Sequence, residues 1–247
     1  MITILSNPKT LPSARVLGEA IGREGKSVIV TKYAEEVDPA SYLVRYGNST
    51  TVKNRKELGN SAEMIRICGD KQKTSEILIS HGIETPVFHS EMVPTDYPVL
   101  VRTTLTAFDG KGVFVAENMM EYTSLLTEGS VWTVWYNFSS EYRVHVVGNE
   151  VARIFKKIFT GEDEEEYPIR TNSRYKFSLR TGFESFKYMI KFVDSISSKL
   201  HLELVALDIG FCADSRRYVL IELNSAPGLN NNTADIYARR IVRNLET

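Results

Sequence analysis

Three oxygen-bearing side chains interrupt two apolar runs in LVALDIGFCADSRRYVLIELNSAPGL, which spans residues 204–229. Asp208 lies in the first run, and Glu222 and Asn224 lie in the second. Side chains alternate between the two faces of a strand, so Glu222 and Asn224 share one face. If the runs form a hairpin around residues 214–216, Asp208 lies opposite Glu222, and a slip of two residues would keep both on the same face.

Two carboxylates and an amide oxygen on one face suit a hard divalent cation. Carboxylates this close would repel each other if unpaired, and one would have to take up a proton. Magnesium binds a few protein oxygens and completes its shell with phosphate or water oxygens. The alternative is a solvated sheet face with scattered polar residues, which a lone carboxylate would favour. The triplet, followed directly by Ser-Ala-Pro-Gly, favours the metal site.

A glycine-containing segment, TAFDGKG (106–112), joins two predicted strands. Glycine lets the backbone approach a ligand closely, and free N–H groups beside Lys111 suit phosphate. Most such turns are only hairpins, and the glycine spacing matches neither a P-loop nor a dinucleotide-binding fingerprint. Just before this segment, Arg102 stands in the apolar run VLVR. A buried arginine needs an anionic partner, unless it reaches water from an edge strand.

Charged residues also stand in two later predicted strands. In EYRVHVV, Glu141, Arg143 and His145 share a face, so the first two either pair structurally or both face a ligand. In ARIFKKIF, Lys156 and Lys157 point to opposite faces, so at most one of them faces the site.

Composition excludes several classes of protein. A chain of 247 residues suffices for one large domain or for two or three lobes. With a net charge of −1, no broad field for nucleic acid or an anionic membrane is expected. No apolar run approaches the roughly 18 residues of a membrane span, and MITILSNPKT lacks the features of a secretion signal. Cys68 and Cys212 lie in apolar contexts, which indicates buried thiols in a reducing compartment, and we expect a cytoplasmic protein.

The rest of the pattern predicts an α+β protein. Residues 2–46 read as a small βαβ unit followed by a further extended run. Asn60 and Asp70 are the predicted caps of two helices that end near Cys68 and Gly82. Further strands are predicted at 98–102, 112–118, 131–138, 141–148 and 150–159, and helices at 118–129, 183–200 and 233–245, with a polar stretch over 160–174.

In this order, the motifs resemble the ATP-grasp superfamily, in particular its carboxylate–amine ligases such as RimK-like ligases, glutathione synthetase and D-alanine–D-alanine ligase. The resemblance covers about residues 60–230, and its most specific part is Asp208 followed by IELNSAPGL. It implies an ATP-grasp fold with a short N-terminal βαβ lobe (1–66), a central subdomain with the glycine-rich loop (67–130) and a C-terminal subdomain with the metal site (131–247). The two subdomains would grip a nucleotide between antiparallel sheets.

The resemblance also implies a role for each matching residue. Lys71, in GDKQKTSEILISHGIETP, would contact the nucleotide, Arg102 stands where the family usually has lysine, and Glu141 would accept from the ribose hydroxyls. The other implied nucleotide-binding positions are Thr106, Gly110, Lys111 and Gly112 at the triphosphate, Val134, Trp135, Tyr136 and Asn137 at adenine, and Asn172 in IRTNSR.

The implied reaction is ADP-forming ligation of a carboxylate to an amine. Asp208, Glu222 and Asn224 would hold one or two magnesium ions, with manganese as a substitute, between the β- and γ-phosphates of ATP. The substrate carboxylate would attack the γ-phosphorus to give an acyl phosphate, and an amine would then displace phosphate. The groups implied to stabilise the transferring phosphoryl group are Arg143, Arg170 and either Lys156 or Lys157.

Two other functions stay open from the sequence. One is an ATP-dependent phosphotransferase on the same site, and the other is a non-catalytic nucleotide-binding scaffold, which Arg102 in place of lysine favours. D-alanine ligases carry arginine where this chain has Ala206, which argues against D-alanine as the substrate.

The predicted partners are small-molecule or peptide carboxylates and amines, with no nucleic acid or membrane, and a homo-oligomer stays open. Thr233 is the predicted substrate contact, or else a cap of the last helix. The acidic run at Glu164–Glu166 is either solvated or attracts an amine.

Overall fold

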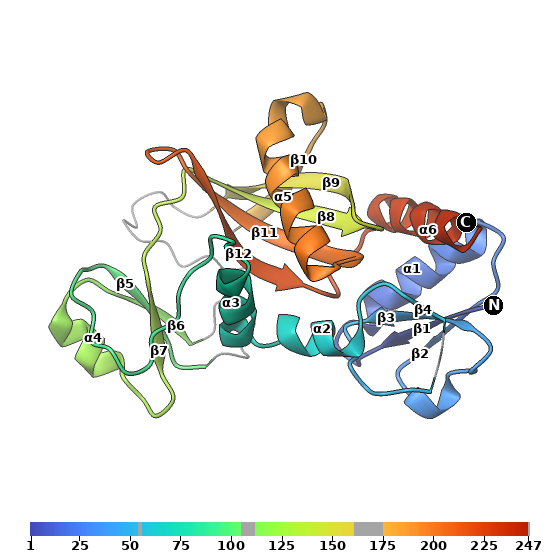
Figure 1. Ribbon diagram of the computed structural model, residues 1–247, viewed down its shortest axis with the longest axis horizontal. Coiled ribbons are helices and arrows are strands. Elements are labelled where there is room, and N and C mark those ends of the chain that lie inside the picture. Colours follow the sequence, from blue (N-terminus) through green and yellow to red (C-terminus); the bar gives the residue numbers. More distant parts are fainter. Residues whose placement is uncertain (54–55, 105–111, 161–174, 247) are drawn as a thin grey trace.

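The computed structural model contains three β-sheets arranged along the long axis of the molecule (Figure 1). It describes residues 1–53, 56–104, 112–160 and 175–246. The five-stranded sheet lies in the middle, the three-stranded sheet at one end and the N-terminal sheet at the other, close to both chain termini (Figure 1). The three sheets follow the order of the predicted lobes, and the lobe boundaries at residues 66 and 130 remain predictions.

The N-terminal lobe is a parallel sheet in the order β2-β1-β3-β4. Its elements are β1 (Ile2–Ser6), α1 (Leu11–Arg23), β2 (Val28–Thr31), the 3-10 helix η1 (Ala34–Glu36), β3 (Tyr42–Tyr46) and β4 (Glu57–Leu58). Leu17 and Ile21 of α1 pack on Ile4, as their helical spacing predicts. Tyr237 and Ile241 of the last helix, α6 (Asn231–Leu245), join the same core, so the chain end completes the first lobe.

The three-stranded sheet is antiparallel, in the order β6-β5-β7. Its elements are β5 (Val99–Arg102), β6 (Val113–Ala116), α4 (Met119–Leu125) and β7 (Val131–Val134). Val99, Val101 and Trp132 form its core with Tyr122 of α4. The apolar run predicts a strand that reaches residue 138. The strand β7 ends instead at Val134, because residues 135–138 leave the sheet.

The five-stranded sheet is antiparallel, in the order β10-β9-β8-β11-β12. Its strands are β8 (Ser140–Val147), β9 (Glu150–Phe159), β10 (Tyr175–Arg180), β11 (Leu204–Cys212) and β12 (Arg217–Asn224). The 3-10 helix η3 (Phe183–Phe186) leads into α5 (Lys187–Leu200), which covers one face with Met189, Val193 and Ile196. The sequence pattern does not predict β10, because this edge strand follows a long polar run and buries little of itself.

Two short helices, α2 (Ala62–Cys68) and α3 (Lys71–Ser80), join the N-terminal lobe to the rest. Asp70 caps α3 as predicted, because its carboxylate accepts hydrogen bonds from the N–H groups of Gln72 and Lys73, each at 3.1 Å. The predicted cap of α2 is wrong, because Ser61 and not Asn60 holds that position.

Asn60 fastens β11 instead. Its amide Nδ2 donates to the carbonyl of Leu204 at 2.5 Å, and its Oδ1 accepts from the N–H of Glu203 at 3.0 Å. The side chain is buried, so this pair of bonds joins the linker before α2 to the strand that carries Asp208.

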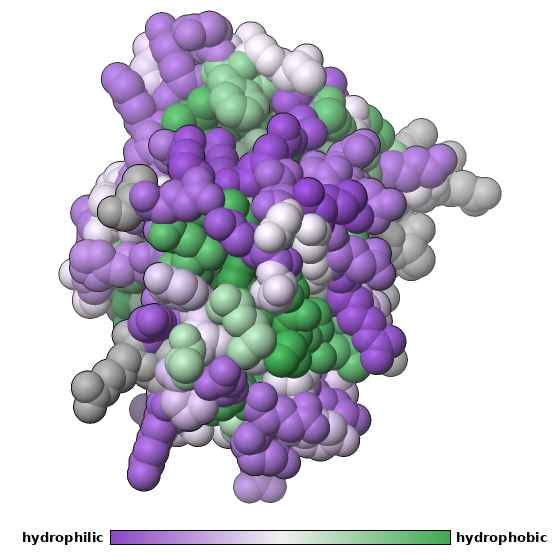
Figure 2. Space-filling view, turned by 90° about the vertical axis from the view of Figure 1, so that its right-hand side faces the viewer, coloured by the Kyte–Doolittle hydropathy of each residue, from purple (hydrophilic) through white to green (hydrophobic). Residues whose placement is uncertain are grey.

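The surface at the N-terminal end is mostly hydrophilic, with hydrophobic side chains set among polar ones (Figure 2). Among the large apolar residues of this lobe, Met1, Ile29 and Tyr33 are exposed. Over the described ranges, no helix is both long and apolar enough to cross a membrane.

We predict that Asn60→Ala lowers the free energy of unfolding by about 1–3 kcal/mol, because it leaves buried backbone groups of β11 without partners. Urea denaturation measures this change. Lys73→Ala, at an exposed position of α3, is the control and should stay within about 0.5 kcal/mol of wild type. Equal stability of the two variants would contradict the role of Asn60.

Candidate active site

The β11–β12 hairpin brings the three oxygen-bearing residues together. Asp208 pairs directly with Glu222, and Ala206 pairs with Asn224, which confirms the register expected from the sequence. The register shifts after Asp208, because Ile209 pairs with Leu220, so a bulge lies next to the acidic pair.

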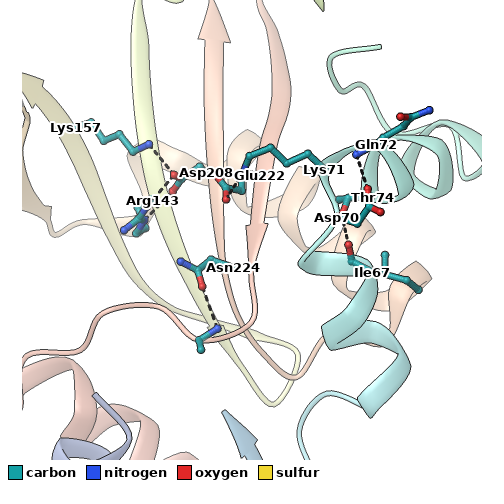
Figure 3. Close-up of polar contacts among 11 residues, drawn as sticks. Ile67, Asp70, Lys71, Gln72, Thr74, Arg143, Lys157, Asp208, Glu222 and Asn224 are labelled. Atoms are coloured by element: carbon teal, nitrogen blue, oxygen red, sulfur yellow. Dashed lines mark hydrogen bonds and ion pairs between the residues drawn. The ribbon is translucent and has the colours of Figure 1, made fainter. Parts of the chain in front are cut away.

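The carboxylate of Asp208 is held by two cations. Arg143, its direct neighbour on β8, donates from Nε and from one terminal nitrogen to the two carboxylate oxygens at 2.7 and 2.8 Å. Lys157 of β9 donates from Nζ to the second oxygen at 2.7 Å (Figure 3). Asp208 is only 5% exposed, so these charge-assisted bonds replace its hydration.

The two cations decide the charge state of Asp208. Burial alone would raise the pKa of this carboxyl, but the charges of Lys157 and Arg143 hold it well below its usual range. The carboxylate therefore stays ionised at neutral pH and is available as an oxygen ligand.

Glu222 has a cation of its own. Lys71, the first residue of α3, donates from Nζ to Glu222 Oε1 at 2.7 Å (Figure 3). Asn224 Oδ1 accepts from the N–H of Ala226 at 3.0 Å and so shapes the start of the turn that follows β12. Lys71, predicted to contact a nucleotide, therefore lies at the site and in this structure pairs with an acidic residue.

Of the two candidate lysines, Lys156 and Lys157, the strand register turns Lys156 away from the site. Glu141 pairs with Lys157, and Tyr142 pairs with Lys156, so Lys156 points to the opposite face. Lys157 contacts Asp208 and also lies 3.7 Å from Glu141, the predicted ribose ligand. The sequence left the two lysines open, and only the pairing of β8 with β9 separates them.

The turn after Asn224 is fastened by the N-terminal lobe. The hydroxyl of Tyr46 donates to the carbonyl of Pro227, and the N–H of Leu229 donates to Ser13 Oγ at 3.3 Å. Gly47, at φ +72°, lies so close that a Cβ there would be 2.8 Å from the Cβ of Ala226. The first lobe therefore supports the backbone behind the predicted metal ligands.

Thr233 does not suit its predicted role as a substrate contact. Its side chain is 2% exposed, and its N–H donates to Oδ1 of Asn230, which is the cap of α6. Thr233 is therefore neither accessible nor the cap.

Helix α6 covers the sheet face of Asp208 and Arg143 at the position of His145. Tyr237 lies within hydrogen-bond distance of His145, with 2.9 Å between its hydroxyl and Nδ1, and both side chains are buried. Burial, with the nearby charge of Arg143, lowers the pKa of His145 to about 3. His145, which shares the face of Arg143, is therefore a neutral part of the core and not a ligand of the site.

Where the structure describes them, the other predicted nucleotide residues lie in or next to the three-stranded sheet. Arg102 ends β5, and its buried Nε has no hydrogen-bond partner. Gly112 adopts φ +68°, and a Cβ there would lie 2.8 Å from Thr103 Oγ1. Val134 ends β7, and the hinge residues Trp135, Tyr136 and Asn137 follow it. Thr106, Gly110, Lys111, Arg170, Asn172 and the acidic run at Glu164–Glu166 lie outside the described residues.

Sequence reasoning missed Phe138. Its ring lies against Gly210 of β11, where a Cβ would come within 2.3 Å of the ring, and it stacks on Tyr136 at 5.4 Å between centroids. The glycine inside an otherwise apolar strand was the available signal, since such a glycine marks a close approach.

The donor set fits a magnesium ion that arrives with a polyphosphate. Over the described parts of the chain, no three acidic, histidine or cysteine side chains gather to hold a metal by themselves. Two carboxylates and one amide oxygen are typical of magnesium, which takes its other ligands from phosphate and water. Lys71, Arg143 and Lys157 neutralise the carboxylates here and are the cations that phosphate oxygens would attract.

The comparisons with known proteins agree with this architecture. No family model matches the chain. The D-alanine–D-alanine ligase of Fusobacterium nucleatum is 22% identical over 218 residues, which cover 83% of this chain and 75% of that protein.

Two solved structures superpose on nearly the whole chain. The D-alanine–D-alanine ligase from Bacillus anthracis complexed with ATP has a TM-score of 0.68 at 14% identity and covers 99% of this chain and 97% of its own. The RimK domain ATP-grasp protein from Sphaerobacter thermophilus has a TM-score of 0.63 at 16% identity, with 96% and 98% covered. The chain has the ATP-grasp fold, as the sequence motifs predicted.

We predict that the free energy of unfolding falls as the pH drops below about 6.5, the usual pKa of histidine in an unfolded chain. Because the pKa of His145 is about 3 in the folded protein, only the unfolded state takes up this proton between those values. His145 should add a slope of up to about 1.4 kcal/mol per pH unit. His145→Gln should flatten the curve in that window, and an identical slope in urea titrations of both proteins would contradict the assignment.

Proposed function

We propose that this protein is an ATP-dependent, ADP-forming ligase that joins a carboxylate to an amine through an acyl phosphate. The observation that carries the proposal is the face where Asp208 and Glu222 stand side by side among Lys71, Arg143 and Lys157. Such a site neutralises a polyphosphate and presents its terminal phosphorus for attack. The fold, and a curated ligase relative at 22% identity, support the same chemistry.

The nucleotide would lie between the three-stranded and five-stranded sheets. Residues 134–137 would receive adenine, and Glu141 the ribose, beside a cavity of about 360 Å³ lined by Phe138, Ser139, Ser140, Glu141, Lys156, Lys157, Ile158, Phe159, Tyr175 and Arg180. Arg102 supports this placement, because its buried Nε lacks a partner that a phosphate oxygen would supply. The arginine therefore takes the place of the family's lysine as a phosphate donor.

Asp208, Glu222 and Asn224 would hold magnesium, which neutralises the phosphate oxygens and aligns them. Arg143 and Lys157 would then each exchange a carboxylate partner for a phosphoryl oxygen. Both are already oriented by β8 and β9, so little reorganisation is needed when charge develops. Phe138 over Gly210, together with the nearby sheets, would help to keep water away from the acyl phosphate.

The sequence and the site narrow the class of substrate but do not identify the substrates. The proteins similar to this chain include D-alanine–D-alanine ligases, but the family pattern that the sequence resembles has arginine at the position of Ala206. We therefore propose a different small-molecule or peptide carboxylate and amine. The non-catalytic alternative would leave unexplained why the sheet maintains ionised, buried Asp208 beside two cations.

We predict that Asp208→Asn and Glu222→Gln each lower ATP turnover about a hundredfold or more, because each removes a charged metal ligand. Release of ADP and phosphate, measured with pooled carboxylates and amines, should require both classes of substrate. Glu203→Gln, which affects a carboxylate bound to Gly59 away from the site, is the control and should keep turnover. Phosphate passed to a stable acceptor without an amine would support the phosphotransferase alternative. Calorimetry that detects no binding of Mg·ATP would overturn both.

A further inference from the structure

One row of directly paired residues crosses all five strands of the central sheet. From β12 to β10 it reads Glu222, Asp208, Arg143, Phe155 and Leu179. Residues that pair directly point to the same face, so the acidic pair and the two apolar residues share one surface. Three residues of the row are charged and two are apolar, and Arg143 stands at the boundary.

The apolar half continues into the next row of side chains. Phe177 of β10 pairs with Lys157 and lies edge-on to Phe155, with 6.3 Å between ring centroids. The guanidinium of Arg143 lies over Phe177, with Cζ 4.8 Å from the ring centroid. We call Phe155, Phe177 and Leu179 the apolar shelf. Phe177 of the shelf contacts Arg143, which binds Asp208, so the shelf is continuous with the candidate active site.

Two of the three residues of the apolar shelf are exposed although they favour burial, and Phe155 is half-buried. Phe177 is 42% exposed and Leu179 is 44% exposed, while α5 covers only the opposite face of the sheet. A solvent-facing edge strand ordinarily carries charged or polar side chains. Exposed apolar residues next to a site are typical of a surface that a ligand covers.

The charges around the apolar shelf indicate the charge of the ligand that would cover it. Arg143 and Lys157 contact or pair with Phe177, and Arg153 lies on the same face, whereas the described stretch from Arg153 to Phe159, together with β10, places no acidic side chain there. The acidic residues of the face, Glu141, Asp208 and Glu222, lie on β8, β11 and β12, farther from β10. The cations therefore stand nearer to the apolar shelf than the acids do. A cationic group would be repelled, whereas a carboxylate is attracted toward Lys157 and Arg143. An apolar group attached to that carboxylate would cover the two phenylalanine rings and Leu179.

We infer that the substrate whose carboxylate is activated carries an aromatic or large aliphatic group, which binds on the apolar shelf of Phe155, Phe177 and Leu179. This inference rests on the proposed function for the fate of the carboxylate, but the binding itself does not require ATP. Arg143 is then shared between the two halves of the site, holding Asp208 and forming the edge of the substrate's apolar pocket.

Small probes test the inference without knowledge of the natural substrate. Ligand-observed NMR titration of the nucleotide-free chain should show 3-phenylpropionate binding at least about tenfold more tightly than propionate, because a buried ring adds apolar contact. Phenethylamine, which has the same ring on an ammonium group, should bind more weakly than 3-phenylpropionate. Phe177→Ser and, separately, Leu179→Ser should bring the ratio of the two acids close to one.

Phe183→Ser is the matched control, because Phe183 is 41% exposed but belongs to η3, outside the face. The control should keep the wild-type ratio. A wild-type ratio near one, equal binding of the amine, or a ratio unchanged in both shelf variants would overturn the inference. Since these titrations contain no nucleotide, failure of ATP turnover would count against the proposed ligase and leave the shelf result standing.

Discussion

The ionised state of Asp208 is the constraint on which the site depends. A buried carboxylate in an inner strand of a sheet is unfavourable unless cations approach it closely, and two do so from the next two strands on one side, β8 and β9. Because Arg143 and Lys157 come from β8 and β9, the sheet has to pair in the observed order for the charge to be balanced. Glu222 lies on β12, the other neighbour of β11, and its charge is balanced by Lys71 of α3, an earlier part of the chain. The same contacts thus link the topology to the chemistry.

The cations around the acidic pair differ in how they are held. Lys71 and Lys157 each reach a carboxylate through a long side chain that ends in one nitrogen, so under the proposed function they would turn to a phosphate without movement of the backbone. Arg143 makes two bonds to Asp208 and lies over Phe177, and these contacts fix the plane of its guanidinium. Under the proposed function it would exchange one of these bonds for a phosphoryl oxygen and keep that plane.

Local sequence patterns predicted what depends on neighbouring residues. Alternation in two apolar runs was enough to place Asp208 opposite Glu222, and the Asp70 cap followed from its residue type. The choice between Lys156 and Lys157 depends on a register between strands, and alternation alone does not give that register. Asn60 was mistaken for a cap because its partners, at Glu203 and Leu204, lie far away along the chain. The strand β10 was missed although Tyr175, Phe177 and Leu179 alternate with polar residues, because the strand is short and directly follows a long polar run.

The turn at 225–229 is held against the N-terminal lobe at three points. Tyr46 and Ser13 hold it by hydrogen bonds, and Gly47 approaches it so closely that no side chain fits between them. Because Asn224 directly precedes this turn, its position depends on a lobe that supplies none of the charged groups around Asp208 and Glu222. A side chain added at Gly47 would press on the turn and so disturb the site from a distant part of the sequence.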